Sequence, residues 1–149
     1  MNTIVDLATE TDLPALADLL SELFALEADF QPNRENQLRG LRLIHESPDI
    51  GQLFVLRVDG RVAGMANALF TVSTAQGTKV LLLEDVIVSQ ACRGRGLGRR
   101  LVEHVCAWAK AAGMTRVTLL ADQDNAPALA FYQSLGFDFS AMRVLRRRL

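Results

Sequence analysis

The most informative stretch of this chain reads Leu82-Leu-Glu-Asp-Val-Ile-Val-Ser-Gln-Ala-Cys-Arg-Gly-Arg-Gly-Leu-Gly-Arg-Arg-Leu101. It begins as an apolar run that carries Glu84 and Asp85, and it continues as a glycine-rich loop that opens a helical pattern. Three glycines in five residues let backbone N–H groups come close to an anion. The first helical turn adds unpaired N–H groups and the positive end of the helix dipole. The stretch therefore predicts an anion site, and a pyrophosphate is the anion that suits it best.

The glycine spacing excludes two well-known nucleotide loops. A Walker A loop needs Gly, four residues and then Gly-Lys-Ser/Thr. Its second glycine would fall at Arg99 or at Leu101, and the dinucleotide fingerprint also fails at Arg99. What remains is Arg-x-x-Gly-x-Gly at Arg93, Gly96 and Gly98. For the loop taken alone, a glycine-rich connection that binds nothing stays as the alternative.

A second informative segment reads Asp124-Asn-Ala-Pro-Ala-Leu-Ala-Phe-Tyr-Gln-Ser-Leu-Gly-Phe137. Asn125 is a good helix N-cap, Pro127 is tolerated in the first turn, and Gly136 suits the position just after the helix. Tyr132 is the single tyrosine of the chain and lies inside this helix. It is either a buried residue with a satisfied hydroxyl or a functional group.

In order and spacing, these two segments resemble the GCN5-related N-acetyltransferases (GNAT superfamily), which bind acetyl-coenzyme A through this loop. The motifs are most similar to those of the N-acetyltransferases for polyamines and glucosamine phosphate. The resemblance spans residues 3–149 and is specific only between Leu82 and Phe137. It implies an α/β acyl-CoA N-acyltransferase fold and direct transfer of acetyl from acetyl-CoA to the primary amine of a small amine, amino acid or polyamine. A protein N-terminus or lysine as acceptor, and a non-catalytic acyl-CoA-binding module, stay open as alternatives.

The resemblance also implies roles for single residues. Glu84 is the general base, acting directly or through a water, and Tyr132 is the acid that protonates the departing thiolate. Asp85 is expected on the opposite face of the strand, because strand side chains alternate, and it has a weaker role, either contacting the substrate or holding structure. A structural carboxylate is the alternative for Glu84. The positions implied to hold coenzyme A are Val86, Ile87, Val88, Arg93, Gly94, Arg95, Gly96, Leu97, Gly98, Arg99, Asn125 and Ala128.

The acceptor is expected near the end of the first helix and the loop after it, the region that faces the acceptor in this fold. Phe24 and Glu27 are the candidate contacts, with Asp29 and Phe30 beside them. Together with Glu84, these acids favour a cationic amine. Ordinary solvated loop charges are the alternative for Glu27 and Asp29.

Composition and charge limit which classes of protein and which partners are expected. A formal net charge of −1 gives no case for a nucleic-acid partner. No apolar run approaches the roughly 20 residues of a membrane helix, and the N-terminus has no basic signal region, so a cytoplasmic protein without a membrane partner is expected. Cys92 and Cys106 form no CxxC pair, and His45 and His104 have no ligand set around them, so no metal is expected. We expect one domain over 1–149, and the resemblance implies a homodimer.

Hydrophobic periodicity predicts the element order βααβββαβαβ, a mixed sheet with helices on both faces. The predicted strands are 4–7, 52–58, 62–72, 79–88, 116–120 and 137 to about 147. The predicted helices run from Thr11 or Asp12 to about Glu27, from Asn33 to about residue 46, from Leu97 to Gly113, and over 125–135. Residues 79–88 are apolar almost throughout, which predicts a central strand covered on both faces.

Overall fold

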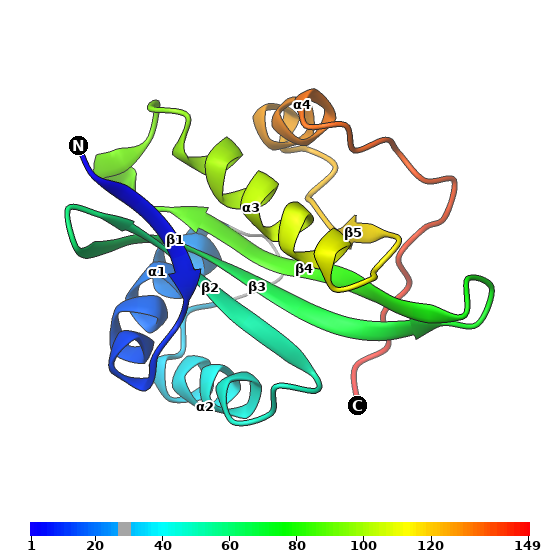
Figure 1. Ribbon diagram of the computed structural model, residues 1–149, viewed down its shortest axis with the longest axis horizontal. Coiled ribbons are helices and arrows are strands. Elements are labelled where there is room, and N and C mark those ends of the chain that lie inside the picture. Colours follow the sequence, from blue (N-terminus) through cyan, green and yellow to red (C-terminus); the bar gives the residue numbers. More distant parts are fainter. Residues whose placement is uncertain (27–30) are drawn as a thin grey trace.

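The computed structural model describes residues 1–26 and 31–149. These residues form one five-stranded mixed sheet in the order β1-β2-β3-β4-β5, with four α-helices around it (Figure 1). Neighbouring strands are antiparallel except for β4 and β5, which are parallel. The strands are β1 Thr3–Leu7, β2 Gly51–Val58, β3 Arg61–Ser73, β4 Thr78–Val88 and β5 Val117–Leu119. The helices are α1 Leu13–Leu26, α2 Arg34–His45, α3 Leu97–Ala111 and α4 Ala126–Ser134.

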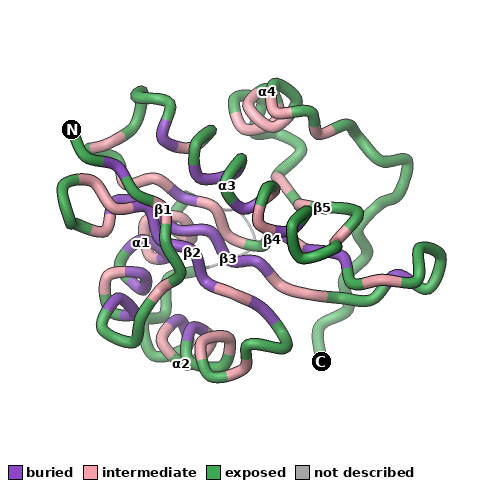
Figure 2. Tube along the Cα trace, in the orientation of Figure 1, coloured by how far each residue is buried: buried purple, intermediate pink, exposed green. Residues whose placement is uncertain are grey.

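Two hydrophobic clusters hold the helices against opposite faces of the sheet. Side chains alternate along a strand, so neighbouring residues of β2 belong to different clusters: Leu53 faces α1 and α2, whereas Phe54 faces α3. Buried residues run along the middle strands and the inner sides of the helices (Figure 2). The prediction that β4 is central and covered on both faces is confirmed, because Leu83 packs with the α3 cluster and Ile87 with the α1 cluster.

Most predicted boundaries are confirmed within a few residues. Asp59 and Gly60 both have positive φ, 50° and 81°, as a two-residue hairpin between β2 and β3 requires. Asn33 caps α2 by accepting a hydrogen bond from the Asn36 N–H. The start of the first helix differs from the prediction. A 3-10 turn, Glu10–Asp12, precedes α1, and the Thr9 N–H donates to Asp12 Oδ2 over 2.8 Å.

A β-bulge lies at Glu84 in β4. Asn67 of β3 pairs with Asp85, but the next residue, Ala68, pairs with Leu83, so Glu84 is left without an opposite residue. A bulge interrupts the alternation of side chains along a strand. The expectation that Glu84 and Asp85 lie on opposite faces was based on an uninterrupted strand. Because β4 has a bulge at Glu84, simple alternation does not apply at these two residues.

The predicted final strand over 137 to about 147 is wrong. These residues follow α4 as irregular chain, and residues 138–149 are exposed (Figures 1 and 2). The element order of the described residues therefore ends at α4. Two features account for the difference. β5 has three residues and offers a short edge for pairing, and arginines at 143 and 146–148 favour solvent over a sheet.

Candidate active site

Three segments meet at Gly98, in the first turn of α3. A Cβ atom built there would lie 3.3 Å from Cζ of Phe131 on α4 and 3.9 Å from Cγ2 of Val88 at the end of β4. Because glycine has no side chain, the end of β4, the start of α3 and α4 can pack closely at this residue. This contact brings the glycine-rich loop and the Tyr132 helix, distant in sequence, to one place.

The glycine-rich loop has the backbone geometry of an anion site. Gly94 and Gly96 have positive φ, 80° and 72°, and a Cβ at either would find no atom within 4 Å. The first bond of the helix runs from the Arg100 N–H to the Gly96 carbonyl, 3.2 Å. The N–H groups of residues 97–99 precede that bond and have no acceptor within the helix. Glycine backbone and helix N-terminus thus present donors to the open side of the loop.

The arginines that flank the loop are partly engaged elsewhere. Nε of Arg93 donates to the Val88 carbonyl over 3.0 Å. Nη1 of Arg99 pairs with Glu103 at 3.0 Å, and its Nη2 donates to Ser134 of α4. Leu97 has a buried side chain, so only its backbone is available to a ligand. The loop's donors toward an anion are therefore mainly backbone N–H groups.

The edge of β4 that faces β5 becomes open beside the bulge. β5 pairs with β4 at residues 81–83, ending at Leu83 opposite Leu119. From Asp85 to Val88, β4 pairs with β3 on one side and has no partner strand on the other, as far as the described chain goes. Of the residues predicted to contact coenzyme A, Val86 and Val88 present their backbone N–H groups to this open edge, whereas the N–H of Ile87 faces β3. An extended ligand can pair with such an edge as an added strand does.

The two adjacent carboxylates differ in their surroundings. Glu84 is exposed, whereas Asp85 is half-buried and accepts a hydrogen bond from Asn67 Nδ2 to its Oδ2 at 3.1 Å. Burial raises the pKa of the Asp85 carboxyl above its ordinary value. The hydrogen bond from Asn67 lowers this pKa in part, and the charge of Glu84 raises it further. Sequence reasoning missed Asn67, although a polar residue inside the apolar stretch 63–69 was a visible signal.

Tyr132 lies between two aromatic rings. Its ring makes edge-to-face contacts with Phe131 and Phe137, with centroids 5.1 and 5.8 Å apart. Burial raises the pKa of the Tyr132 hydroxyl to about 12. Within the described residues the structure records no hydrogen bond to this hydroxyl, so the alternative of a satisfied core tyrosine loses its main support. The hydroxyl stays protonated at neutral pH and is available to a ligand.

The other predicted positions are placed as follows. Oδ1 of Asn125 accepts the Ala128 N–H at 3.1 Å, so this side chain caps α4. Phe24 lies half-buried in the last turn of α1, against the α1 cluster. Glu27, with Asp29 and Phe30, lies outside the described residues.

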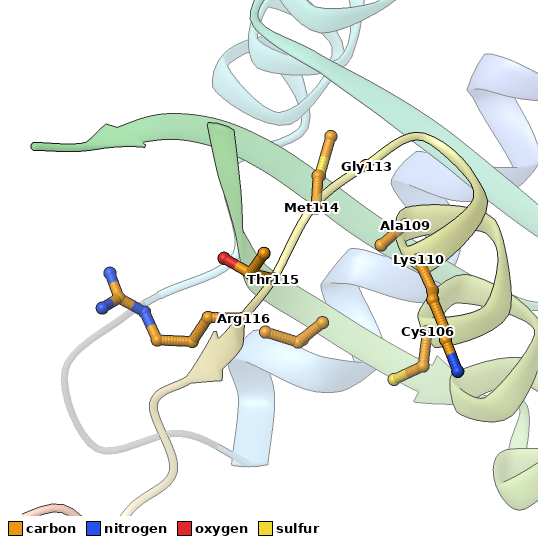
Figure 3. A pocket seen from close by; sticks show the side chains of 8 residues that line it. Cys106, Ala109, Lys110, Gly113, Met114, Thr115 and Arg116 are labelled. Carbon is orange, nitrogen blue, oxygen red and sulfur yellow. The ribbon is translucent and has the colours of Figure 1, made fainter. Parts of the chain in front are cut away.

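A hollow of about 560 Å³ lies away from this site. Its wall includes Cys106 and Lys110 at the end of α3, and Met114 and Arg116 before β5 (Figure 3). α3 has 15 residues and spans about 22 Å at 1.5 Å per residue, and the glycine-rich loop is at its opposite end. The hollow is therefore separate from the loop, and neither Glu84 nor Tyr132 lines it.

A model of the acetyltransferase (GNAT) family matches residues 13–137. The chain belongs to this family.

None of its described helices is long and apolar enough to cross a membrane.

Three curated relatives carry different acetylation activities. The streptothricin acetyltransferase of Streptomyces lavendulae is 32% identical over 97 residues, 65% of this chain and 49% of that protein, so the chain spans about half its length. The glucosamine 6-phosphate N-acetyltransferase of Trypanosoma brucei brucei is 28% identical and covers 92% of each chain. The ribosomal protein bS18-alanine N-acetyltransferase of Escherichia coli K12 is 30% identical over 96% of this chain and 85% of that protein.

Solved structures share the fold. A possible acetyltransferase from Clostridium difficile 630 superposes with a TM-score of 0.91 at 16% identity, over 100% of this chain and 99% of that one. An aminoglycoside N-acetyltransferase in complex with CoA superposes with a TM-score of 0.83 at 21% identity, over 99% and 95% of the two chains. At these identities the likeness shows the mixed-sheet fold alone.

Proposed function

We propose that this chain is an acetyl-CoA-dependent N-acetyltransferase that acts on a primary amine of a small molecule. The observation that carries the proposal is the junction at Gly98, where the loop of backbone donors meets the end of β4 at Val88 and α4 at Phe131, the residue before Tyr132. A pyrophosphate suits the loop, and an extended pantetheine arm suits the open strand edge. The aminoglycoside N-acetyltransferase solved with CoA supports the idea that this fold holds the cofactor.

The chemistry requires no covalent enzyme intermediate. Glu84 takes a proton from the acceptor ammonium, directly or through a water, and the free amine attacks the thioester carbonyl. Backbone N–H groups on the open edge of β4, at Val86 and Val88, stabilise the negative oxygen of the tetrahedral intermediate. The carbon–sulfur bond then breaks, the nitrogen releases its second proton to solvent to give the neutral amide, and the thiolate leaves as coenzyme A.

Tyr132 assists the departing sulfur. Its pKa of about 12 keeps the phenol protonated at neutral pH, so the hydroxyl can donate a hydrogen bond to the departing sulfur. A hydrogen bond from the phenol to the sulfur is the role that agrees with this pKa. It stabilises the developing charge, and the thiolate takes its proton later from solvent.

The acceptor class follows from the acids near the bulge. The exposed Glu84 beside Asp85 favours a cationic amine, as in the polyamine-type motif resemblance. The runner-up acceptor is a protein N-terminus, and the bS18-alanine N-acetyltransferase, which matches most of this chain, supports it. Acetylation of a small amine and acetylation of a protein N-terminus would both use the glycine-rich loop, Glu84 and Tyr132.

The test is a coenzyme A release assay with acetyl-CoA and a panel of monoamines, diamines, amino acids, amino sugars and N-terminal peptides. Calorimetric titration with acetyl-CoA runs in parallel. Turnover with small amines supports the proposal, and turnover only with peptides supports the runner-up. Acetyl-CoA binding without turnover of any acceptor would favour a non-catalytic acyl-CoA-binding module. A protein that neither binds acetyl-CoA nor acetylates any acceptor would refute the proposal.

A further inference from the structure

Asn67 is a buried polar residue that packing does not explain. It sits in the otherwise apolar stretch 63–69 of β3 and is 6% exposed. Its register partners are Leu53 on β2 and Asp85 on β4. Among the described residues, its Oδ1 is a buried atom without a hydrogen-bond partner. Buried polar atoms in folded proteins are nearly always paired, so an unpaired one needs a reason.

The other end of the same amide has a specific partner. Nδ2 of Asn67 donates to Oδ2 of Asp85, which lies beside the bulge residue Glu84. Asp85 Oδ1 accepts no hydrogen bond recorded for residues 1–26 and 31–149. The ion pairs of these residues involve neither Asp85 nor Glu84. One oxygen of a half-buried carboxylate is thus fixed, the other is free, and among the residues that the structure describes no cationic side chain pairs with the two adjacent carboxylates.

Asp85 lies on the sheet face that α1 covers, because it is opposite Asn67, which in turn pairs with Leu53 of the α1 cluster. α1 crosses this face of the sheet diagonally, from Asp12 beside Arg57 of β2 to Glu22, whose Oε1 accepts the Gln90 N–H after β4. Because Glu22 is near the end of α1, the last turn of this helix, where the acceptor is expected, lies on the β4 side, on the face that carries Asn67.

We propose that Asn67 is a positioning residue of the acceptor site, which holds Oδ2 of Asp85 and leaves Oδ1 to bind the ammonium group of the acceptor. The proposal rests on the proposed function, because it assigns the acceptor of that reaction. A cation at Asp85 and Glu84 offsets two neighbouring negative charges, whereas an anionic group on the acceptor adds a third. The site therefore selects amines without a carboxylate or phosphate near the reacting nitrogen.

Two probes of equal length test the charge selection. 1,4-Diaminobutane carries a second ammonium where 4-aminobutanoate carries a carboxylate. We expect the wild-type protein to favour the diamine at least 10-fold in kcat/KM. Asp85→Asn keeps the side-chain size but removes the charge, and it should abolish most of this preference. A preference that is absent in the wild type or unchanged in Asp85→Asn overturns the proposal.

Asn67→Leu tests the positioning role. We expect the KM for 1,4-diaminobutane to rise at least 10-fold, while the acetyl-CoA Kd measured by calorimetry is unchanged. A merely structural role would lower stability and affect both ligands. Ser73→Ala is the matched control, since Ser73 is equally buried at the far end of the same strand. If Asn67→Leu does not fold, Asp85→Asn decides the question.

A readout that needs no turnover separates this proposal from the proposed function. The side-chain amide resonance of Asn67 is followed by NMR while the CoA-loaded protein is titrated with each probe. A saturable shift with the diamine only, in a protein that acetylates nothing, supports the positioning role and refutes the enzyme. Turnover of the diamine with no shift of this resonance, and an unchanged KM in Asn67→Leu, supports the enzyme and overturns the positioning role.

Discussion

At the residue scale, Tyr132 gives a test that removes one atom. Tyr132→Phe deletes the hydroxyl and keeps the ring that packs between Phe131 and Phe137. We expect kcat to fall about 10-fold or more, equivalent to about 1.4 kcal/mol of transition-state stabilisation. Stopped-flow measurement of the acetyl-transfer step and calorimetry with acetyl-CoA would check this. Affinity should be nearly unchanged, and the loss should shrink with an acyl donor whose leaving group is a weaker base. Unchanged turnover would reduce Tyr132 to a packing residue.

Glu84 is tested by its expected pH behaviour as a base. Glu84→Gln should lower turnover by roughly 10²-fold at neutral pH, a typical general-base contribution. Part of the loss should be recovered at high pH, where the amine acceptor is already neutral. Glu46→Gln, an exposed carboxylate at the end of α2, is the control for loss of charge alone. A pH–rate profile like that of the wild type would assign Glu84 a structural role.

The sequence predicted part of the candidate site at this scale. Glu84, Tyr132 and the loop glycines stand in recognisable local motifs, so they could be selected from the sequence. Asn67 could not be assigned a role in the same way, because its partner Asp85 is 18 residues away and the pairing depends on strand register. Its unpaired Oδ1 also costs about 1–3 kcal/mol of desolvation, a cost that only the folded neighbours reveal.

At the element scale, the loop before α3 allows a matched comparison of two glycines. Gly96 and Gly60 both have positive φ, 72° and 81°, and both face open space. Gly96→Val and Gly60→Val should each cost about 1–2 kcal/mol of stability from left-handed backbone strain. Only Gly96→Val should block backbone approach to the pyrophosphate and abolish acetyl-CoA binding. Denaturant unfolding and calorimetry would measure the two effects, and equal acetyl-CoA affinity in both variants would contradict the loop assignment.

The sequence predicted elements best where the signal is local. The Asp59–Gly60 turn and the alternation around it located β2 and β3, and the apolar stripe located α3. The bulge at Glu84 was not predicted, because it depends on the register between β3 and β4. The end of the β4–β5 pairing at Leu83 likewise depends on the folded sheet. The final strand was predicted wrongly for a related reason. A strand needs an edge to pair with, and the three-residue length of β5 is a property of the fold.

At the scale of the whole molecule, the ion pair between Asp12 and Arg57 joins the start of α1 to the sheet. Both guanidinium Nη atoms donate to the Asp12 carboxylate, at 2.9 and 2.7 Å, and Asp12 is buried. The hydrogen bond from Arg57 is the main cause that lowers the pKa of Asp12 from 3.8 to about 2. A folded-state pKa below the unfolded one means that the charged carboxylate stabilises the fold. Its contribution is present above about pH 4 and is lost as the pH falls through about 2.

The stability of Arg57→Met should therefore depend on pH in a defined direction. The shift of Asp12 corresponds to about 2 kcal/mol at neutral pH. We expect a loss of at least that size in the free energy of unfolding at pH 7, because the variant leaves a buried carboxylate unpaired. The loss should shrink between pH 4 and pH 2, where Asp12 becomes protonated and the wild-type protein also loses the pair. Urea unfolding over this range, followed by circular dichroism, gives the measurement. Arg34→Met is the control, because it removes the exposed pair with Asp18 and should cost less than about 1 kcal/mol. A loss in Arg57→Met that is the same at pH 7 and pH 2 would mean that Arg57 stabilises the fold by packing its aliphatic stem and not by its charge.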